Sequence, residues 1–528
     1  MINEMTEQAA RPVVWAVAGS DSGGGAGLAA DLRAIEALGG HACTVVAAVT
    51  AQNSVAVRGI DAVSPDVLDA QLTALAQDMP PAAIKVGMLG SADNLQVLVA
   101  WIMRLRAQHP DLPVIVDPVL RASTGAVFAD DTLLHAYRTK LLPLATLITP
   151  NRAEAAALLG CAALDSPFAV EHAAQALRAL GCQAVAITGG DVAGGVSEDY
   201  AATEHARGWL SLPRVATPHH HATGCVFASS AAGAMARGFV PMDAIVLAKM
   251  ACSHALRHGY AAGQGAGPVR PQTDFALHVA NLPTFSGPGP QSVSPFASLQ
   301  DAELGLYAVV DSVAWVQRVL DAGVRCVQLR IKDHRRVTLR ADIRASIATA
   351  RAAGAQLFIN DHWQLAIDEG AYGVHLGQED LETADLGAIQ RAGLRLGIST
   401  HSYWEVCRAW ALQPSYIACG PIHPTRAKAM PWIAQGNDNL AYWCALLPLP
   451  VVAIAGMDPT RATQAMQCGA AGVAVISDIT AATSPEARIQ ELLAAVSVGQ
   501  LLPQRQSPSL PQSTLSHSHC CTAPMAST

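Results

Sequence analysis

Three consecutive histidines and a Thr-Gly-Cys stand together at residues 219–225, and these residue types could bind a metal, form half of a disulfide or support cysteine chemistry. Tetrahedral zinc needs four ligands, and no second cysteine lies near Cys225, so a metal site is the weaker interpretation. The run at 228–237 is rich in helix formers, which puts Thr223 and Cys225 at a helix N-terminus that favours an anion such as phosphate. There the pKa of Cys225 would be lowered, and its thiolate could act as a base. A capping threonine beside a buried cysteine explains the segment equally well.

The second half of the chain repeats one pattern, in which a short apolar run is followed in most cases by an amphipathic helical segment, for example at 313–322 and 341–353. Eight such units in about 200 residues predict a (β/α)₈ barrel, whereas an open doubly wound sheet would more often stop at about five to seven strands. The runs are LYAVV (306–310), CVQLR (326–330), QLFIN (356–360), GVHLG (373–377), RLGIS (395–399), YIACG (416–420), VVAIAG (451–456) and GVAVIS (472–477).

Reactive groups of such a barrel lie where strands end and loops begin, and polar or glycine residues follow seven consecutive runs here. Asp361 and Asp380 could together hold one Mg²⁺ ion. Arg330, Lys332 and Lys428 would supply the positive charge that a departing pyrophosphate needs. The other groups at these ends are Gln328, Asn360, His375, Gln378, Ser399, Thr400, His401, Thr425, Ala455, Gly456, Met457, Ile476 and Ser477. This set predicts chemistry in which pyrophosphate leaves.

The first half opens with a strand, a glycine-rich turn and a helix at 13–39, without the ending of a P-loop or the spacing of a dinucleotide fingerprint. Asp21 and Asp31 add carboxylates near the exit of the strand and on the helix. Ligands of open α/β sheets lie beyond the carboxyl ends of the strands, so we expect one crevice there. Its expected residues are Gln52, Met88, Asp117, Asn151, Glu154, Thr188, Gly189, Gly190, Thr223, Gly224 and Cys225.

Composition bounds the class of protein. A chain of 528 residues needs at least two domains, and 51% hydrophobic with 14% charged residues indicates well-buried α/β or helical domains. The net charge of −8 argues against a nucleic-acid binder. No secretory signal and no apolar stretch long enough to span a membrane are visible, and the scattered cysteines suit reduced thiols, so we expect a soluble, cytoplasmic protein.

Motifs in both halves resemble known families. AGSDSGGGAGLAADL, TAQN, KVGMLG, VDPV, TPNRAEA and ATGC are similar to hydroxymethylpyrimidine and phosphomethylpyrimidine kinases of the ribokinase-like superfamily. QLRIK, IND, GVHLGQED, GISTHSYWE, GPIHPTRAK and GVAVIS resemble thiamine phosphate synthase. The resemblance implies two consecutive activities, in which ATP-dependent phosphorylation makes hydroxymethylpyrimidine diphosphate and condensation with thiazole phosphate gives thiamine phosphate. It also implies a ribokinase-like α/β sandwich followed by a TIM barrel, acting on small molecules.

We therefore expect an N-terminal extension at 1–11, a kinase domain at 12–281, a Pro/Gly/Ser-rich linker at 282–303, a synthase domain at 304–498 and a disordered tail at 499–528. The tail contains SHSHCC, which could pick up metal but is better explained as accidental composition. We also expect homo-oligomerisation through the kinase domain.

The resemblance also assigns roles. In the kinase half, Cys225 stands where sugar kinases carry a catalytic aspartate. The pyrimidine would contact Gly19, Asp31, Gln52 and Met88, and Mg-ATP would contact Asn151, Glu154, Thr188, Gly189 and Gly224. In the synthase half, Lys332 and Lys428 would be catalytic, Asp361 and Asp380 would hold Mg²⁺, and substrates would contact Gln328, Arg330, Lys332, Asn360, Ser399, Thr425, Lys428, Gly456, Ile476 and Ser477.

Five positions depart from the family patterns. In the kinase half, Ala222 stands where glycine is usual, a small change unless φ there is positive. In the synthase half, Ile331 replaces Glu, His362 Arg, Ala427 Thr and Ala455 Gly. Loss of that threonine hydroxyl and of that glycine would weaken phosphate binding, so these four departures predict reduced rather than absent synthase activity. The principal alternative is a pyridoxal-type kinase fused to an inactive scaffold or regulatory barrel, and a non-enzymatic binding protein is a more distant one.

Overall fold

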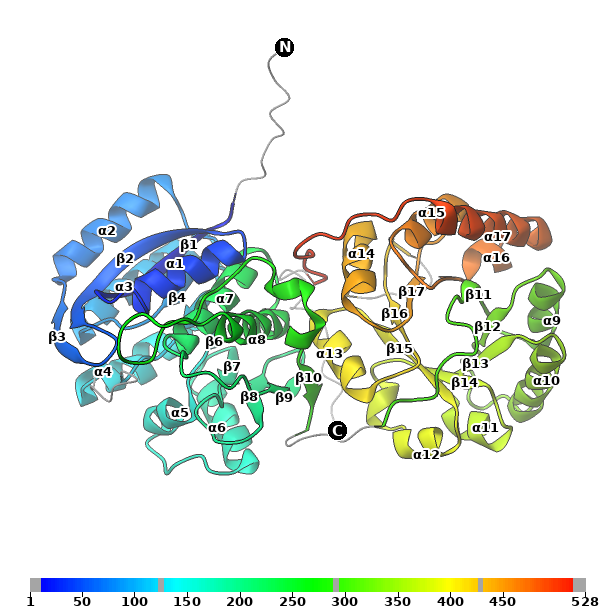
Figure 1. Ribbon diagram of the computed structural model, residues 1–528, viewed down its shortest axis with the longest axis horizontal. Coiled ribbons are helices and arrows are strands. Elements are labelled where there is room, and N and C mark those ends of the chain that lie inside the picture. The colour runs from blue at the N-terminus through cyan, green and yellow to red at the C-terminus, as the bar shows by residue number, and fades with distance from the viewer. Residues whose placement is uncertain (1–10, 122–127, 288–293, 426–430, 516–528) are drawn as a thin grey trace, which may run out of the picture. The chain divides into compact units, whose positions relative to one another are not determined.

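The computed structural model describes residues 11–121, 128–287, 294–425 and 431–515. The chain divides into two compact units, residues 1–290 and 291–528, each with its own elements (Figure 1). We call them the N-terminal unit and the barrel unit.

A ten-stranded sheet forms the centre of the described part of the N-terminal unit, in the order β10-β9-β8-β7-β6-β5-β4-β1-β2-β3. Neighbours from β2 to β7 in this order pair in parallel, and β3, β8, β9 and β10 add antiparallel edges. The strands are β1 (Val13–Asp21), β2 (His41–Gln52), β3 (Val57–Ala62), β4 (Ala83–Val86), β5 (Val114–Val116), β6 (Leu147–Ile148), β7 (Ala184–Ile187), β8 (Val196–Ala202), β9 (Arg207–Pro213) and β10 (Thr284–Ser286).

Helices cover both faces of this sheet, as an α/β sandwich requires. On one face α1, α7 and α8 lie side by side, with Ala30, Val226 and Ala255 at their contact (Figure 1). The other helices pack with the strands around a larger apolar cluster that includes Trp15, which is fully buried. The helices are α1 (Gly27–Ala37), α2 (Pro65–Asp78), α3 (Ala92–Arg106), α4 (Asp131–Ala136), α5 (Arg152–Leu159), α6 (Pro167–Ala179), α7 (Thr223–Ala236) and α8 (Pro241–Arg257). Short helical turns η1 (Tyr137–Leu141), η2 (Leu142–Leu144), η3 (Phe275–Leu277) and η4 (Val279–Asn281) join them.

Eight parallel strands close into a barrel in the second unit, in chain order, which confirms the predicted (β/α)₈ architecture. They are β11 (Gly305–Val310), β12 (Cys326–Leu329), β13 (Gln356–Asn360), β14 (Gly373–Leu376), β15 (Arg395–Thr400), β16 (Tyr416–Cys419), β17 (Val451–Ile454) and β18 (Gly472–Val475). Each lies within one residue of a predicted run at its start. Parallel strands that are buried on both faces are continuous apolar runs. Such runs predict strands even though apolar and polar residues do not alternate along them.

Helices surround the barrel in the described residues, and aromatic side chains fill its interior. The helices are α9 (Val313–Asp321), α10 (Leu339–Ala352), α11 (Trp363–Asp368), α12 (Leu386–Arg391), α13 (Tyr403–Leu412), α14 (Gly436–Leu446), α15 (Pro459–Gln467), α16 (Ser477–Thr480) and α17 (Pro485–Leu501), with a turn η5 (Asp380–Glu382). Tyr307, Phe358 and Tyr416 are each at most 1% exposed and contact one another inside the barrel, with the Tyr416 ring edge to face against the other two.

The linker differs from the expected 282–303. Residues 284–286 form β10, which pairs antiparallel with β9 and belongs to the N-terminal sheet. Residues from 294 onward lie on the barrel: Phe296 N–H donates to the Gln413 carbonyl at 3.0 Å, and Ser415 Oγ donates to the Ala297 carbonyl at 2.7 Å. Pro, Gly and Ser composition therefore overestimated the length of the linker at both ends.

The predicted disorder of the tail is wrong for residues 499–515. Helix α17 continues to Leu501, and Arg505 Nη2 pairs with Asp438 at 2.6 Å. Asn439 bonds the backbone of Gln512 twice, at 2.8 and 3.0 Å. Residues 516–528, which contain SHSHCC, lie outside the described residues. None of the described helices is long and apolar enough to cross a membrane.

Candidate functional sites

A cavity of about 850 Å³ opens at the carboxyl ends of the parallel strands in the N-terminal unit, where ligands of such sheets bind. Most of the residues expected in this crevice line the cavity. Residues predicted and found together are Gly19, Gln52, Met88, Asp117, Asn151, Glu154, Thr188, Gly190, Thr223, Gly224 and Cys225. Gly19 has a steric reason, because a Cβ at that position would lie 2.3 Å from the Met88 methyl carbon.

Asp31, predicted to contact the pyrimidine, does not line this cavity. It is fully buried, and its Oδ1 accepts from Lys85 Nζ at 2.8 Å and from Ser229 Oγ at 2.7 Å. Helix α1 carries Asp31 inward because residue 31 lies on the same face as Ala30 and Ala34, which face α7. Asp31 therefore positions a lysine instead of touching the ligand.

Lys85 is a buried cation at the cavity. Its side chain is 1% exposed, and its Nζ lies 2.8 Å from Asp31 and 3.9 Å from Asp117. Burial alone would lower the pKa of Lys85, but the negative charges of Asp31 and Asp117 raise it above its usual value. The cavity floor thus presents a permanent ammonium group, which can attract phosphoryl oxygens.

Two carboxyl groups share the cavity. Burial raises the pKa of Asp117 to about 6, against the attraction of Lys85. Burial, and then the charge of Asp117, raises the pKa of Glu154 to about 8. A divalent cation bound here would stabilise both carboxylates, because its charge would offset their mutual repulsion and the cost of their burial.

Asn151 and Glu154 close the start of α5 as a capping box. Glu154 N–H donates to Asn151 Oδ1 at 2.8 Å, and Asn151 N–H donates to Glu154 Oε2 at 2.9 Å. This pairing fixes both side chains at the cavity edge. Gly189, predicted to contact ATP, is not part of the cavity lining; its N–H donates to Asp199 Oδ1 at 2.9 Å.

Helix α7 begins at the opening Thr-Gly-Cys, as predicted, but Cys225 is not a low-pKa thiol. Burial raises the pKa of Cys225 to about 12, and the positive charge of Lys85 offsets this only in part. The thiol is therefore neutral, which corrects the expectation of a thiolate. Ala222, the N-cap residue, has φ of 71°, the left-handed conformation that favours glycine.

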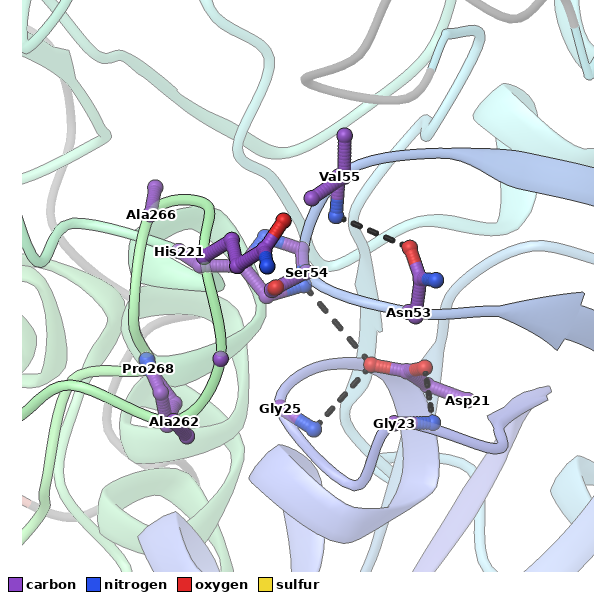
Figure 2. A pocket seen from close by; sticks show the side chains of 12 residues that line it. Asp21, Gly23, Gly25, Asn53, Ser54, Val55, His221, Ala262, Ala266 and Pro268 are labelled. Atoms are coloured by element: carbon purple, nitrogen blue, oxygen red, sulfur yellow. Dashed lines mark hydrogen bonds and ion pairs between the residues drawn. The ribbon is translucent and has the colours of Figure 1, made fainter.

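A smaller pocket of about 280 Å³ adjoins the glycine-rich turn (Figure 2). Asp21 accepts backbone N–H bonds from Gly23, at 2.8 Å, and from Gly25, at 3.1 Å, and its Oδ2 lies 3.7 Å from His221 Nε2. Figure 2 shows the His221 ring turned toward this carboxylate. Burial alone would raise the pKa of Asp21, yet the hydrogen bonds from His221 and the backbone lower it. One histidine of the 219–221 run therefore holds the turn.

The acidic pair of the barrel converges as predicted. Asp361 follows β13 and Asp380 begins η5 after β14, so neighbouring parallel strands deliver both to one rim. Burial raises the pKa of Asp361 to about 6. The charge of Asp380 and its hydrogen bond to Asp361 add to this rise, and Arg330 opposes it. Asp380 Oδ2 also accepts from Gly377 N–H at 3.0 Å. Two carboxyl groups pressed together beside an arginine fit the oxygen ligands of a Mg²⁺ ion.

A buried hydrogen-bond chain crosses the barrel beneath this rim. Ser399 Oγ lies 2.8 Å from His375 Nε2, and His375 Nδ1 lies 2.7 Å from the hydroxyl of Tyr416. That hydroxyl lies 2.8 Å from Tyr307 Oη, which accepts from Gln328 Nε2 at 3.2 Å. Burial, and then Arg330, lower the pKa of His375 to about 4, so the imidazole is neutral. These hydrogen bonds fix the side chains of Ser399 and Gln328, both of which were predicted to bind substrate.

The remaining rim residues occupy the predicted strand ends. Asn360 ends β13 and is 7% exposed, Lys332 is exposed after β12, and Thr425 follows β16. Gly456 follows β17 with φ of 69°, next to His423 and Pro424, while Ile476 and Ser477 begin α16. Lys428 and Ala427 lie outside the described residues.

Sequence reasoning missed two buried lysines. Lys249 of α8 pairs with Asp199 at 2.8 Å and donates to Ser197 Oγ at 3.0 Å, all at the same cavity as Lys85. The only available signal was a charged residue inside an apolar run, AIKV for β4 and IVLAKM for α8. A lysine in a buried run requires a partner, but the partner lies 54 residues away for Lys85 and 50 for Lys249, where spacing cannot identify it.

Comparison with known proteins agrees with this division. Residues 21–270 match the phosphomethylpyrimidine kinase family, and residues 306–479 match the thiamine monophosphate synthase family. A probable thiamine biosynthetic bifunctional enzyme of Oryza sativa subsp. japonica is 34% identical over 88% of this chain and 85% of its own length. A thiamine-phosphate synthase of Salmonella dublin is 54% identical over 37% of this chain and 93% of its own.

Among solved structures, pyridoxal kinase from Staphylococcus aureus in complex with AMP-PCP and pyridoxal covers 49% of this chain and 93% of that one, with 28% identity and a TM-score of 0.44. The regions that match the two family models, residues 21–270 and 306–479, fall in the two compact units. Each region contains one of the sites described above. The chain belongs to the family of bifunctional thiamine biosynthetic enzymes, with a ribokinase-like kinase unit followed by a thiamine-phosphate synthase barrel.

Proposed function

We propose that the N-terminal unit uses ATP to phosphorylate 4-amino-5-hydroxymethyl-2-methylpyrimidine and then its monophosphate, and that the barrel joins the diphosphate to thiazole phosphate with release of pyrophosphate. The observation that carries this proposal is the convergence of Asp361 and Asp380 beside Arg330. An inactive barrel would gain nothing from two repelling carboxyl groups, whereas a barrel that releases pyrophosphate needs both charges.

In the kinase unit, the pyrimidine would lie against Gly19, Gln52 and Met88, which line the cavity together. Lys85 would attract the transferring phosphoryl group from the cavity floor. Asn151, Glu154, Thr188 and Gly224 would contact ATP, and Mg²⁺ bound to ATP would neutralise its phosphate charge. Cys225, as a neutral thiol at the start of α7, would donate a hydrogen bond near the reacting oxygens instead of acting as a thiolate base.

In the barrel, Asp361 and Asp380 would hold Mg²⁺, which would neutralise the diphosphate and make it a better leaving group. Arg330, Lys332, Lys428 and Asn360 would bind its oxygens. The pyrimidine carbon–oxygen bond breaks first, pyrophosphate departs with the bonding electrons, and the thiazole nitrogen captures the pyrimidine cation. Gly456, Ile476 and Ser477 would hold thiazole phosphate, and Ser399 and Gln328 would face the pyrimidine. Assembly through the kinase unit and a cytoplasmic location remain part of this proposal.

The departures from the family pattern leave the acidic pair intact. His362 Nε2 lies 2.7 Å from the Ile331 carbonyl, so the substituted residue after β13 contacts the substituted residue after β12. Ile331 is buried, with 4% of its surface exposed. Ala455 has φ of 81°, where an alanine is strained. We therefore propose a synthase of reduced, measurable activity.

The test combines one substitution with the pH dependence. Metal binding requires ionised Asp361, whose pKa is raised to about 6, so the Mg²⁺ concentration for half-maximal synthase activity should be constant above pH 7 and rise roughly tenfold per unit below pH 6. Asp361→Asn should lower synthase kcat/KM at least about a hundredfold, as loss of a group stabilising a leaving charge does. The kinase rate of the same variant should be unchanged.

Asp321→Asn is the matched control, because Asp321 is an exposed carboxylate at the end of α9. Pyridoxal serves as the comparison substrate for the kinase. A purified chain that makes the pyrimidine diphosphate, but no thiamine phosphate when thiazole phosphate and Mg²⁺ are supplied, would contradict the proposal for the barrel. Faster turnover of pyridoxal than of the pyrimidine would contradict the proposal for the kinase unit.

A further inference from the structure

A second cluster of ligand-type side chains lies outside the kinase cavity. His254, Asp274 and His278 each present one nitrogen or oxygen atom, and all three atoms lie within 4.8 Å of one another. His254 Nε2 is 3.8 Å from Asp274 Oδ1, and His278 Nε2 is 3.2 Å from Asp274 Oδ2. One carboxylate therefore stands between two imidazoles, with one oxygen toward each.

The chain supplies these residues in two i, i+4 pairs. His254 and His258 lie one turn apart at the end of α8, and Asp274 and His278 flank η3 in the segment that leads to β10. Residues four apart face the same side of a helical turn, which is the spacing of paired metal ligands on helices. The His258 ring lies 4.4 Å from the His254 ring, between centroids, and its Nδ1 bonds the His254 carbonyl at 2.9 Å. Its Nε2 is then the nitrogen that remains for a ligand.

Burial distinguishes this cluster from ordinary surface charge. His254 is 3% exposed, and its Nε2 is the nitrogen that faces Asp274. Asp274 and His278 are about half exposed, with side-chain exposures of 46% and 52%, which gives an ion a path from solvent.

We propose that His254, Asp274 and His278 bind a divalent transition-metal ion, with Zn²⁺ the expected occupant and His258 or water as the fourth ligand. Imidazole and carboxylate donors suit Zn²⁺, whereas the Mg²⁺ of the two reactions prefers oxygen ligands alone. Ligands of tetrahedral zinc at about 2.0–2.1 Å lie about 3.4 Å apart. The observed atoms, which lie within 4.8 Å of one another, need to close by at most about 1.4 Å, which side-chain rotation of the exposed Asp274 and His278 can supply.

The ion would join α8 to the segment before β10. Arg257 already bonds this segment, donating to the Ala280 carbonyl at 3.2 Å, and Asn281 Nδ2 donates to the Phe275 carbonyl at 2.8 Å. A metal bound across the same two elements would stabilise the edge of the sheet through binding to the folded state alone. Its role is structural, because no residue of the cluster lines the kinase cavity.

The test is Zn²⁺ titration of the full-length chain after chelator treatment, by calorimetry, with the thermal unfolding temperature as second readout. We expect a binding step that disappears, or weakens at least about tenfold, in His278→Ala and in Asp274→Asn, together with loss of the Zn²⁺-dependent rise in unfolding temperature. Both substituted side chains are about half exposed, so both variants should fold.

Two controls separate this site from others. His172→Ala removes an exposed histidine of α6 in the same unit, and Cys520→Ser with Cys521→Ser removes the thiols of the SHSHCC segment. Both should retain the binding step and the temperature shift. The proposal is overturned if the chelator-treated chain without substitutions binds no Zn²⁺. It is also overturned if His278→Ala and Asp274→Asn keep full affinity for Zn²⁺ while the cysteine variant loses it.

Discussion

Cys225 shows how burial and a helix dipole compete at one residue. A helix N-terminus stabilises an anion by about 0.3–1 kcal/mol in ordinary settings, which corresponds to less than one pKa unit. Desolvation of a thiol is a larger effect, and here it raises the pKa of Cys225 to about 12 despite the nearby Lys85 ammonium. The first turn of α7 can therefore offer its N–H groups to phosphate oxygens without a charged cysteine.

This assignment predicts the reactivity of the thiol. At pH 7.5 almost all of Cys225 should be in the neutral thiol form, and the exposed Cys161 is the internal control. Iodoacetamide should therefore modify Cys225 at least about a hundredfold more slowly, and its rate should still be rising with pH above 9. Mass spectrometry of peptides from the full-length chain measures both rates. Comparable rates at the two cysteines would show that the thiolate forms after all.

The position of a site residue could be predicted from the sequence where that residue directly follows a strand. Asp361 and Asp380 come directly after neighbouring runs, and parallel strands deliver such residues to one rim, so their convergence followed from chain order. Asp31 was misplaced because its face of α1 depends on the packing of α7, which the local sequence does not encode. Lys85 was missed for the same reason, since its role arises from a partner on another element.

Two of the departures from the family pattern lie at the ends of elements, at residues with a left-handed backbone conformation. Ala222 has φ of 71° before α7, and Ala455 has φ of 81° after β17, and a Cβ in this region costs about 1–2 kcal/mol. Glycine avoids that cost but gains conformational entropy when unfolded, so the net gain is smaller.

We therefore expect Ala455→Gly to raise the free energy of unfolding of the barrel unit by about 0.5–1 kcal/mol, and Ala222→Gly to do the same for the N-terminal unit. Urea unfolding of the full-length chain, followed by circular dichroism, measures both. Ala345→Gly, at an exposed position inside α10, is the matched control and should lower the free energy by about 0.5–1 kcal/mol. Destabilisation by Ala455→Gly would mean that the loop holds this alanine through contacts that outweigh the strain.

Strands and connections differed in how far the sequence determined them. The barrel strands were bounded almost to the residue because each is a short buried run between helical patterns. The tail was misjudged because its few anchors are polar: Asn439 and Asp438 recruit Gln512 and Arg505 through hydrogen bonds that composition does not reveal. Leu515, 4% exposed, is a single apolar anchor in a stretch otherwise poor in large apolar residues.

At the scale of the whole chain, each reaction has a site built from one unit. The kinase cavity is lined by residues 18–256, and the acidic pair with its arginine belongs to the barrel. The apolar clusters are also separate, since those of the strands and helices up to residue 269 share no member with the cluster inside the barrel. The two activities should therefore be lost independently.

Mixing two singly inactivated chains tests this independence. Glu154→Gln keeps an oxygen to cap α5 but cannot ionise, so it should lower the kinase rate at least about a hundredfold and spare the synthase. Asp361→Asn should do the reverse. Because the described residues of each site belong to one unit, an equimolar mixture should convert hydroxymethylpyrimidine, ATP and thiazole phosphate into thiamine phosphate, after a lag in which the diphosphate accumulates in solution. A mixture that stays inactive, although each variant performs its remaining half-reaction, would require the intermediate to pass within one chain.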